Sequence, residues 1–88
     1  MEQIAIEIEE EFGVTLDELK SKSRIRSIVE ARHLFCYFAH ERGYTYTYIG
    51  KFINRDHSSV INGKSNVTDL RKFNDEFKKK FDRLINRF

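Results

Sequence analysis

Apolar residues recur every three or four positions along most of this 88-residue chain, and the interruptions fall at glycines and polar clusters. That spacing is typical of amphipathic α-helices, whereas the signals for β-strands are weak. The chain contains no proline, no internal repeat and no low-complexity segment, so nothing in it indicates a linker. We therefore predict one compact, all-α domain over residues 1–88.

Local signals mark the first two helices. An apolar stripe at Ile4, Ile8 and Phe12 predicts an opening helix. The residue after this stripe, Gly13, suits the left-handed conformation that commonly ends a helix. Thr15 is followed three residues later by a glutamate, which is the spacing of a capping box, so a short second helix should begin there.

The remaining pattern predicts four further helices. A long central helix is expected over residues 27–42, with Gly43 as its stop. A shorter helix should follow over residues 44–53, although the β-branched residues near its start would also suit a strand. Another helix is expected over residues 56–69. The last helix carries an apolar stripe that should close the core against the central helix: Phe73, Phe77, Phe81, Leu84, Ile85 and Phe88.

Charge is sorted along the chain. Residues 1–19 hold seven acidic residues and no Lys or Arg, a balance of −7, while the remainder holds all 16 basic residues against seven acidic ones, a balance of +9. This asymmetry is typical of a nucleic-acid-binding surface whose opposite side is acidic. The alternative is a solvated surface on which the charges segregated by accident.

Several classes of protein are disfavoured. The lone Cys36 cannot form an internal disulfide and should be a small buried hydrophobe, which fits a reducing cytosol. No apolar run reaches membrane-spanning length, and the N-terminus is acidic where a signal peptide would be basic. There is no phosphate-binding Gly-Lys-Ser/Thr loop, so we expect no ATP binding and no cofactor. A cytoplasmic protein without membrane contact is predicted.

The most informative polar stretch covers residues 54–60, Asn-Arg-Asp-His-Ser-Ser-Val, at the start of one predicted helix and just after another. A helix-turn-helix presents its recognition helix to the DNA major groove in this way. Asp56 could accept from a base amine, His57 could bond purine N7 or O6, and Ser58 could do either. Asp56 could instead be a simple N-cap. Arg55 could contact a phosphate, which we favour, or form a surface ion pair with Asp56 or another acid.

Catalysis and metal binding are both disfavoured. Asp56, His57 and Ser58 are the residue types of a hydrolytic triad, but neighbours on a helix point in different directions and cannot converge. The three histidines, His33, His40 and His57, show no shared spacing, and Cys36 has no second cysteine to support a metal site. We therefore predict a protein that is not an enzyme and has no metal site.

A basic loop is expected over residues 20–24, and Lys22, Arg24 and Arg26 alternate along and just beyond it. A loop arginine can enter a narrow A·T minor groove, where the negative potential is enhanced. The alternative is a solvated charged loop. Arg32 lies on an otherwise apolar helix face and needs either a phosphate or a buried carboxylate, and we favour the phosphate.

The order of these motifs resembles the C-terminal DNA-binding domain of the bacterial chromosomal replication initiator DnaA. The resemblance extends over about residues 4–84 and is carried by residues 12–14, 17–19, 21–26, 28–29, 31–32, 48–50 and 55–60. It implies an all-helical, Trp-repressor-like fold with a helix-turn-helix that binds a short A/T-rich box in double-stranded DNA at a replication origin. The implied setting is the nucleoid of a bacterial or phage-infected cell.

The resemblance also implies roles for particular residues. Arg24 would read the minor groove, while Asp56, His57 and Ser58 would read the major groove. Ser59 and Arg32 would face phosphates, and Tyr46 and Thr47 would approach a thymine methyl and the backbone. The DNA-contacting set that we expect is Lys22, Arg24, Arg26, Arg32, His33, Tyr46, Thr47, Arg55, Asp56, His57, Ser58, Ser59 and Lys64.

Departures from the family pattern leave several alternatives open. The turn reads Ile53, Asn54 where the family usually has two glycines, although Asn tolerates a left-handed conformation. Ser58 and Ser59 stand where threonines are usual, and His33 replaces a frequent glutamine. Without an ATPase portion the chain would bind DNA without opening it, either as part of a longer initiator, as its competitor, or as a separate transcriptional regulator. Possible partners are the full-length initiator or another replication protein. A protein-interaction module that has lost DNA binding is the other class.

Overall fold

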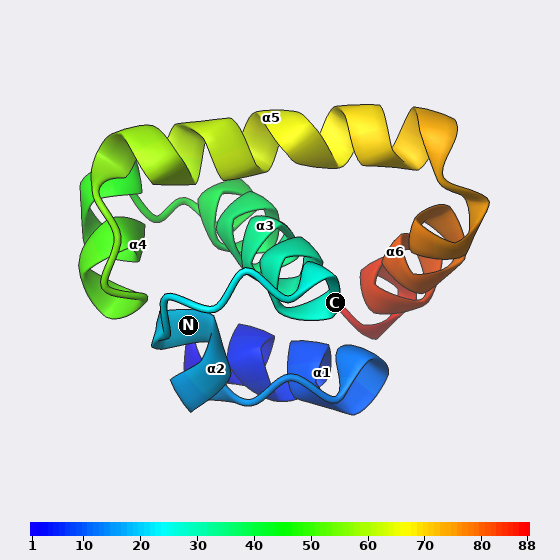
Figure 1. Cartoon of the computed structure of the whole chain (residues 1–88), viewed down its shortest axis with the longest axis horizontal. Helices are drawn as coiled ribbons and strands as arrows, with labels where there is room; N and C mark the ends of the chain where they lie inside the picture. Colours follow the sequence, from blue (N-terminus) through cyan, green and yellow to red (C-terminus); the bar gives the residue numbers. More distant parts are fainter.

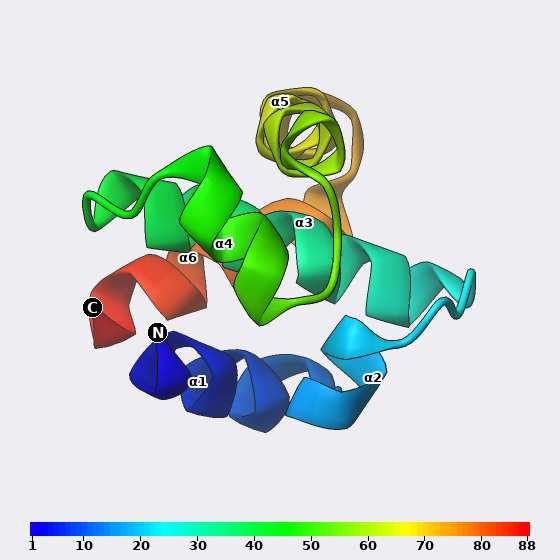
Figure 2. The same ribbon diagram turned by 90° about the vertical axis from the view of Figure 1, so that its left-hand side faces the viewer.

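The computed structural model describes residues 1–88 and consists of six helices with no strand. The helices are α1 (Glu2–Phe12), α2 (Leu16–Lys20), α3 (Arg26–Glu41), α4 (Tyr46–Phe52), α5 (His57–Phe73) and α6 (Asp75–Arg87). Helix α3 lies in the middle, with α5 across one side and α1 and α2 on the opposite side (Figures 1 and 2). Helices α4 and α6 close the two ends (Figure 1). The predicted all-α class is confirmed.

The local signals for helix ends are also confirmed. Gly13 ends α1 in the left-handed conformation, with φ of 69°. Thr15 forms the predicted capping box, in which its hydroxyl accepts from Glu18 N and the Glu18 carboxylate accepts from Thr15 N. Helix α4 begins two residues later than predicted, because Thr45 is extended and its hydroxyl caps the helix by accepting from Tyr48 N at 3.1 Å. Helix α5 continues to Phe73, four residues beyond its predicted end.

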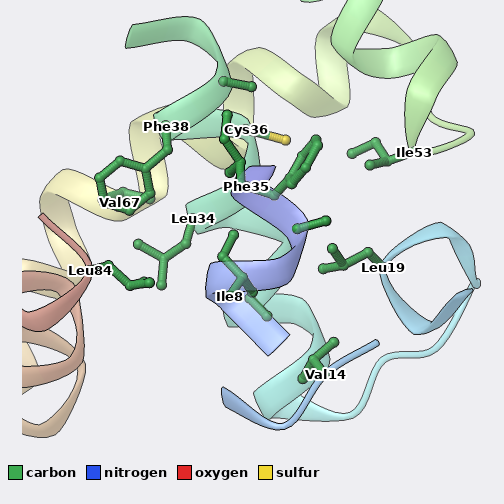
Figure 3. Close-up of a cluster of buried hydrophobic side chains, with 14 of the residues drawn as sticks. Ile8, Val14, Leu19, Leu34, Phe35, Cys36, Phe38, Ile53, Val67 and Leu84 are labelled. Atoms are coloured by element: carbon green, nitrogen blue, oxygen red, sulfur yellow. The ribbon is translucent and has the colours of Figure 1, made fainter. Parts of the chain in front are cut away.

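The core is entirely apolar and forms around α3. Leu34 and Phe35 of that helix have no exposed surface. Figure 3 shows that side chains from elsewhere in the chain surround them: Ile8, Val14, Leu19, Ile53, Val67 and Leu84. Because each of these elements contributes apolar area to one cluster, the helices on either side of α3 are fixed relative to each other.

The predicted stripe of the last helix is correct in its centre and wrong at its ends. Phe77, Phe81 and Leu84 are buried, whereas Phe73 is 85% exposed. Phe73 belongs to α5, and the extended Asn74 interrupts the helix and caps α6 by accepting from Phe77 N. The spacing of four residues therefore spans a helix break. Two further stripe residues at the end of the chain are also partly exposed, Ile85 at 46% and Phe88 at 38%.

The acidic first helix is bound to the last one. Arg87 donates to Glu7 Oε2 at 2.8 Å and to Glu10, and Arg83 donates to Glu11. These bonds engage three acidic side chains of α1, the helix that lies on the side of α3 opposite α5 (Figure 1). The acidic residues of α1 that bond α6 therefore lie away from α5.

Cys36 is buried, as expected, with 2% of its surface exposed. Burial raises the pKa of its thiol to about 12, so the group stays protonated and acts as a small apolar side chain. None of the six helices combines the length and the apolar character needed to cross a membrane.

Candidate nucleic-acid interface

The turn between α4 and α5 is tight and leaves little freedom to its backbone. Asn54 adopts the left-handed conformation with φ of 62°, as its side chain permits. Arg55 N donates to Gly50 O at 2.7 Å, and a Cβ at Gly50 would collide with the carbonyl oxygen of Arg55. The absence of a side chain at Gly50 therefore lets the turn fold back on α4 and fixes the direction in which α5 begins.

Asp56 is the N-cap of α5. Its Oδ1 accepts from Ser59 N at 2.8 Å, and these interactions with Ser59 lower the pKa of the carboxyl. The carboxylate bonds Ser59 and not His57, so the arrangement is not that of a hydrolytic relay. No three His, Cys, Asp or Glu side chains gather closely enough to hold a metal ion.

One face of α5 is open along its first three turns. Val60, Gly63 and Val67 face the core. The opposite face is exposed and begins with the predicted residues His57 and Ser58. It continues with three residues that the sequence analysis did not name: Ile61, Asn62 and Ser65. Their spacing of three, four and seven residues from Ser58 is the signal that could have found them. Lys64 is half-buried at the edge of this face.

The basic loop occupies residues 21–25 and is shaped by its serines. Ser21 Oγ donates to Glu18 O at 2.7 Å and accepts from Ser23 N at 3.2 Å, and Ser23 Oγ accepts from Ile25 N at 3.2 Å. Lys22 and Arg24 project into solvent. An ordered loop can present these two cations without first losing much conformational entropy.

Arg26 lies outside the loop and begins α3. Its Nε lies 3.3 Å from Glu30 Oε2, in an exposed ion pair one helical turn apart. Such pairs contribute little to stability, so the side chain could exchange Glu30 for another anion.

Arg32 has no carboxylate partner, and its contact with a phosphate stays a prediction. Its guanidinium donates to three backbone carbonyls, those of Leu19 at 3.0 Å, Ser21 at 2.9 Å and Ser23 at 3.3 Å. Arg55 does not pair with Asp56. It donates to Asn54 O at 3.2 Å and, like Arg32, to Ser21 O. Burial, together with the nearby Arg55, lowers the pKa of Arg32.

Tyr46 and Thr47 occupy the first turn of α4. The Tyr46 ring stacks on His40 of α3 with the centroids 4.1 Å apart, which gives it a packing role. Thr47 is exposed beside it. Both therefore lie at the edge of the helix-turn-helix, where a scaffold helix can approach a DNA backbone.

His33 lies where α3 crosses α5. Its Nδ1 would be only 3.0 Å from a Cβ at Gly63, and its Nε2 lies 3.5 Å from Asn66 Nδ2. Burial and the neighbouring Arg32 lower the pKa of His33. A protonated imidazole is therefore disfavoured between these helices.

The free energy of unfolding should consequently fall on acidification. The unfolded chain takes up a proton at His33 near the ordinary pKa of about 6.5, whereas the folded chain resists it, so stability is lost as pH falls through that value. Urea unfolding followed by circular dichroism between pH 7.5 and pH 5, chosen to span about one and a half units below the ordinary histidine pKa, measures this loss. His33→Gln should reduce it, because glutamine does not titrate. Identical pH profiles for the two proteins would contradict the assignment.

The structure brings the two predicted DNA-binding segments together. Lys22, Arg24, Arg32 and Arg55 line one surface hollow of about 650 Å³ with Ser23 and Val29. Asp56, His57 and Ser58 follow directly from Arg55. His33 and Tyr46 take part in helix packing and Arg26 pairs with Glu30, and the contacts of these three residues with DNA stay predictions.

Known proteins resemble this chain in sequence. A family model described as the bacterial DnaA protein helix-turn-helix matches residues 1–67. The chromosomal replication initiator protein DnaA of Mycoplasma capricolum is 34% identical over 82 residues, covering 91% of this chain and 18% of the relative. The protein of that name from Mesoplasma florum is 37% identical over 81 residues, covering 90% and 18%. That from Streptococcus agalactiae serotype Ia is 30% identical over 89 residues, covering 99% and 20%. The chain thus spans about a fifth of the length of these relatives.

Proposed function

The chain belongs to the bacterial DnaA helix-turn-helix family, and we propose that it binds double-stranded DNA at one short A/T-rich box. The observation that carries this proposal is the hydrogen-bonded junction between the basic loop and the turn before α5. This junction places two exposed cations, Lys22 and Arg24, beside the exposed polar start of the predicted recognition helix. A single duplex can meet both segments at once.

In this proposal the open face of α5 enters the major groove. His57 and Ser58 in the first turn, and Asn62 one turn later, offer donors and acceptors to base edges. Ile61 is 41% exposed on the same face and offers an apolar surface to a thymine methyl. Asp56 caps the helix through Oδ1, so its carboxylate is already held in position before DNA binds, and it can accept from a base amine there.

Arg24 reads the neighbouring minor groove. It is exposed at the centre of an ordered loop, and a guanidinium in a narrow A·T minor groove gains from the negative potential there. Lys22, Thr47, Ser59 and Lys64 lie on either side of these segments and suit phosphate contacts, which position the protein without reading sequence.

Replication initiation, or its regulation, is the cellular role that we propose, because every relative described above is named as the replication initiator. A role in protein interaction alone is less well supported. Its main argument was the acidic first helix, and the acids of that helix at Glu7, Glu10 and Glu11 are bonded to α6.

Two variants should lose base discrimination in the major groove. We expect His57→Ala and Asp56→Asn each to weaken binding to the preferred duplex by about 1–3 kcal/mol and to relax preference at adjacent positions. Asparagine is as good an N-cap as aspartate, so Asp56→Asn tests the carboxylate without removing the cap. The preferred duplex is first selected from a random pool by the wild-type chain, and affinities are then measured by fluorescence anisotropy.

Arg24→Ala should act at a different place on the same duplex. Preference for an A·T step several base pairs away should disappear, because a minor-groove arginine senses groove width more than base identity. Asp82→Asn, on the exposed surface of α6, is a matched control for Asp56→Asn and should keep the wild-type preference. The proposal fails if the folded His57→Ala, Asp56→Asn and Arg24→Ala variants all bind selected and random duplexes as the wild type does.

A further inference from the structure

Two guanidinium groups from distant parts of the chain share one acceptor. Arg32 of α3 donates to the carbonyl oxygen of Ser21 at 2.9 Å, and Arg55 of the helix-turn-helix turn donates to the same oxygen. Ser21 lies 34 positions before Arg55 and begins the basic loop. A direct bond therefore joins the loop to the residue that precedes the recognition helix.

Both arginines are tied to backbone and not to a carboxylate. The contacts of Arg32 run along alternate residues, Leu19, Ser21 and Ser23, so the last turn of α2 and the loop after it turn three carbonyls toward one guanidinium. Neither Arg32 nor Arg55 forms an ion pair with an acidic side chain, and the nearby Arg55 disfavours the charge of Arg32. Two like charges stay in this position because several carbonyl dipoles compensate them.

The two hydrogen bonds from Arg32 and Arg55 to Ser21 O form a bridge between the helices and the loop. The end of this bridge at Arg55 is rigid. Its N–H donates to Gly50 O at 2.7 Å, and its carbonyl oxygen packs so closely on Gly50 that a Cβ there would collide with it. The next residue caps α5. Because the Arg55 side chain starts from this fixed backbone, its bond to Ser21 O holds the loop in place relative to α5. The bond from Arg32 to the same oxygen holds the loop in place relative to α3.

Resting on the DNA-binding function proposed above, we propose that Arg32 and Arg55 are positioning residues that fix the separation between Arg24 and the first turn of α5. The chain can then make its minor-groove and major-groove contacts together only when the two sets of bases lie at one spacing along the duplex. This role differs from a phosphate contact, which would add affinity without setting the spacing.

The first test uses the protein without DNA. Hydrogen exchange of the amides at residues 22–25 should be faster in Arg55→Gln and Arg32→Gln than in the wild type, because the carbonyl groups of the loop lose the guanidinium groups that donate to them. Lys51→Gln is the matched control, since it removes one positive charge from exposed α4 with no hydrogen bond to the loop. Its loop amides should exchange at the wild-type rate.

The second test uses the duplex that the wild-type chain selects from a random pool, and the same duplex with one base pair inserted between the A·T step and the major-groove positions. The insertion should cost the wild type about tenfold or more in affinity. For Arg55→Gln this ratio should fall to about twofold, because a loosened loop can follow the displaced step. Lys51→Gln should keep the wild-type ratio. Arg55→Lys keeps the charge but not the two-pronged guanidinium, so its ratio of affinities for the two duplexes should fall as that of Arg55→Gln does.

The outcomes separate the two roles. If Arg55→Gln and Arg55→Lys, both folded by circular dichroism, keep the wild-type ratio and wild-type exchange, Arg55 does not position the loop and the proposal is wrong. If Arg55→Gln weakens both duplexes equally while Arg55→Lys restores affinity, Arg55 is only a phosphate contact. If the wild type selects no duplex, the proposed DNA-binding function fails, and the exchange rates alone decide whether the bridge holds the loop.

Discussion

Replacing Phe81 by alanine should lower the free energy of unfolding by about 3–5 kcal/mol. The Phe81 ring has no exposed surface and contacts the rings of Tyr37 and Phe38 with centroids 5.3 Å away. The Arg71 guanidinium lies over the same ring, 4.1 Å from its centroid. Removal of the ring would leave a cavity between α3, α5 and α6 that these neighbours cannot close without moving. Urea unfolding followed by helical circular dichroism measures the loss.

Phe73→Ala is the matched control, because the sequence placed both phenylalanines on one stripe. Phe73 is 85% exposed, so its removal should change the free energy of unfolding by less than about 0.5 kcal/mol. Equal losses for the two variants would show that α5 ends earlier than described and that Phe73 packs with α6.

This pair of residues shows where sequence analysis of the fold stops. Helix ends set by one side chain and its own backbone were predictable, as at Gly13 and Thr15. The break at Asn74 was not, because Asn is a modest signal and the apolar spacing continues across it. Periodicity counts residues on the assumption that one helix continues, and it cannot detect an interruption that preserves the count.

For the candidate interface, the residue types were visible in the sequence but their partners were not. The predicted conformation of Asn54 is confirmed, and the N-cap alternative for Asp56 is what the structure contains. The bonds from Arg32 and Arg55 to the carbonyls of residues 19–23 span 9 to 34 positions, and a backbone acceptor leaves no trace in the sequence. For these two arginines, only side-chain partners or phosphates could therefore be predicted from the sequence.

Affinity for the selected duplex should fall steeply with salt. Each phosphate that the protein neutralises releases condensed counterions, so about five to seven contacts give a log–log slope of about −4 to −6. Raising the salt concentration from 50 to 200 mM should then weaken binding roughly 250- to 4,000-fold. The balance of +9 after residue 19 motivates this estimate, and fluorescence anisotropy over a series of KCl concentrations measures the slope.

Because charge is unevenly distributed over the surface, the salt dependence of binding should arise from the cations beside the basic loop and α5. The acidic helix α1 lies opposite α5 and is bonded to α6, so it neither repels the duplex nor neutralises the basic loop. Lys22→Gln should therefore reduce the magnitude of the slope by about one. Lys79→Gln removes the same charge from the exposed surface of α6 and should leave the slope unchanged. A wild-type slope near zero would contradict DNA binding, and equal reductions for the two lysines would show that the cations act through net charge rather than through this face.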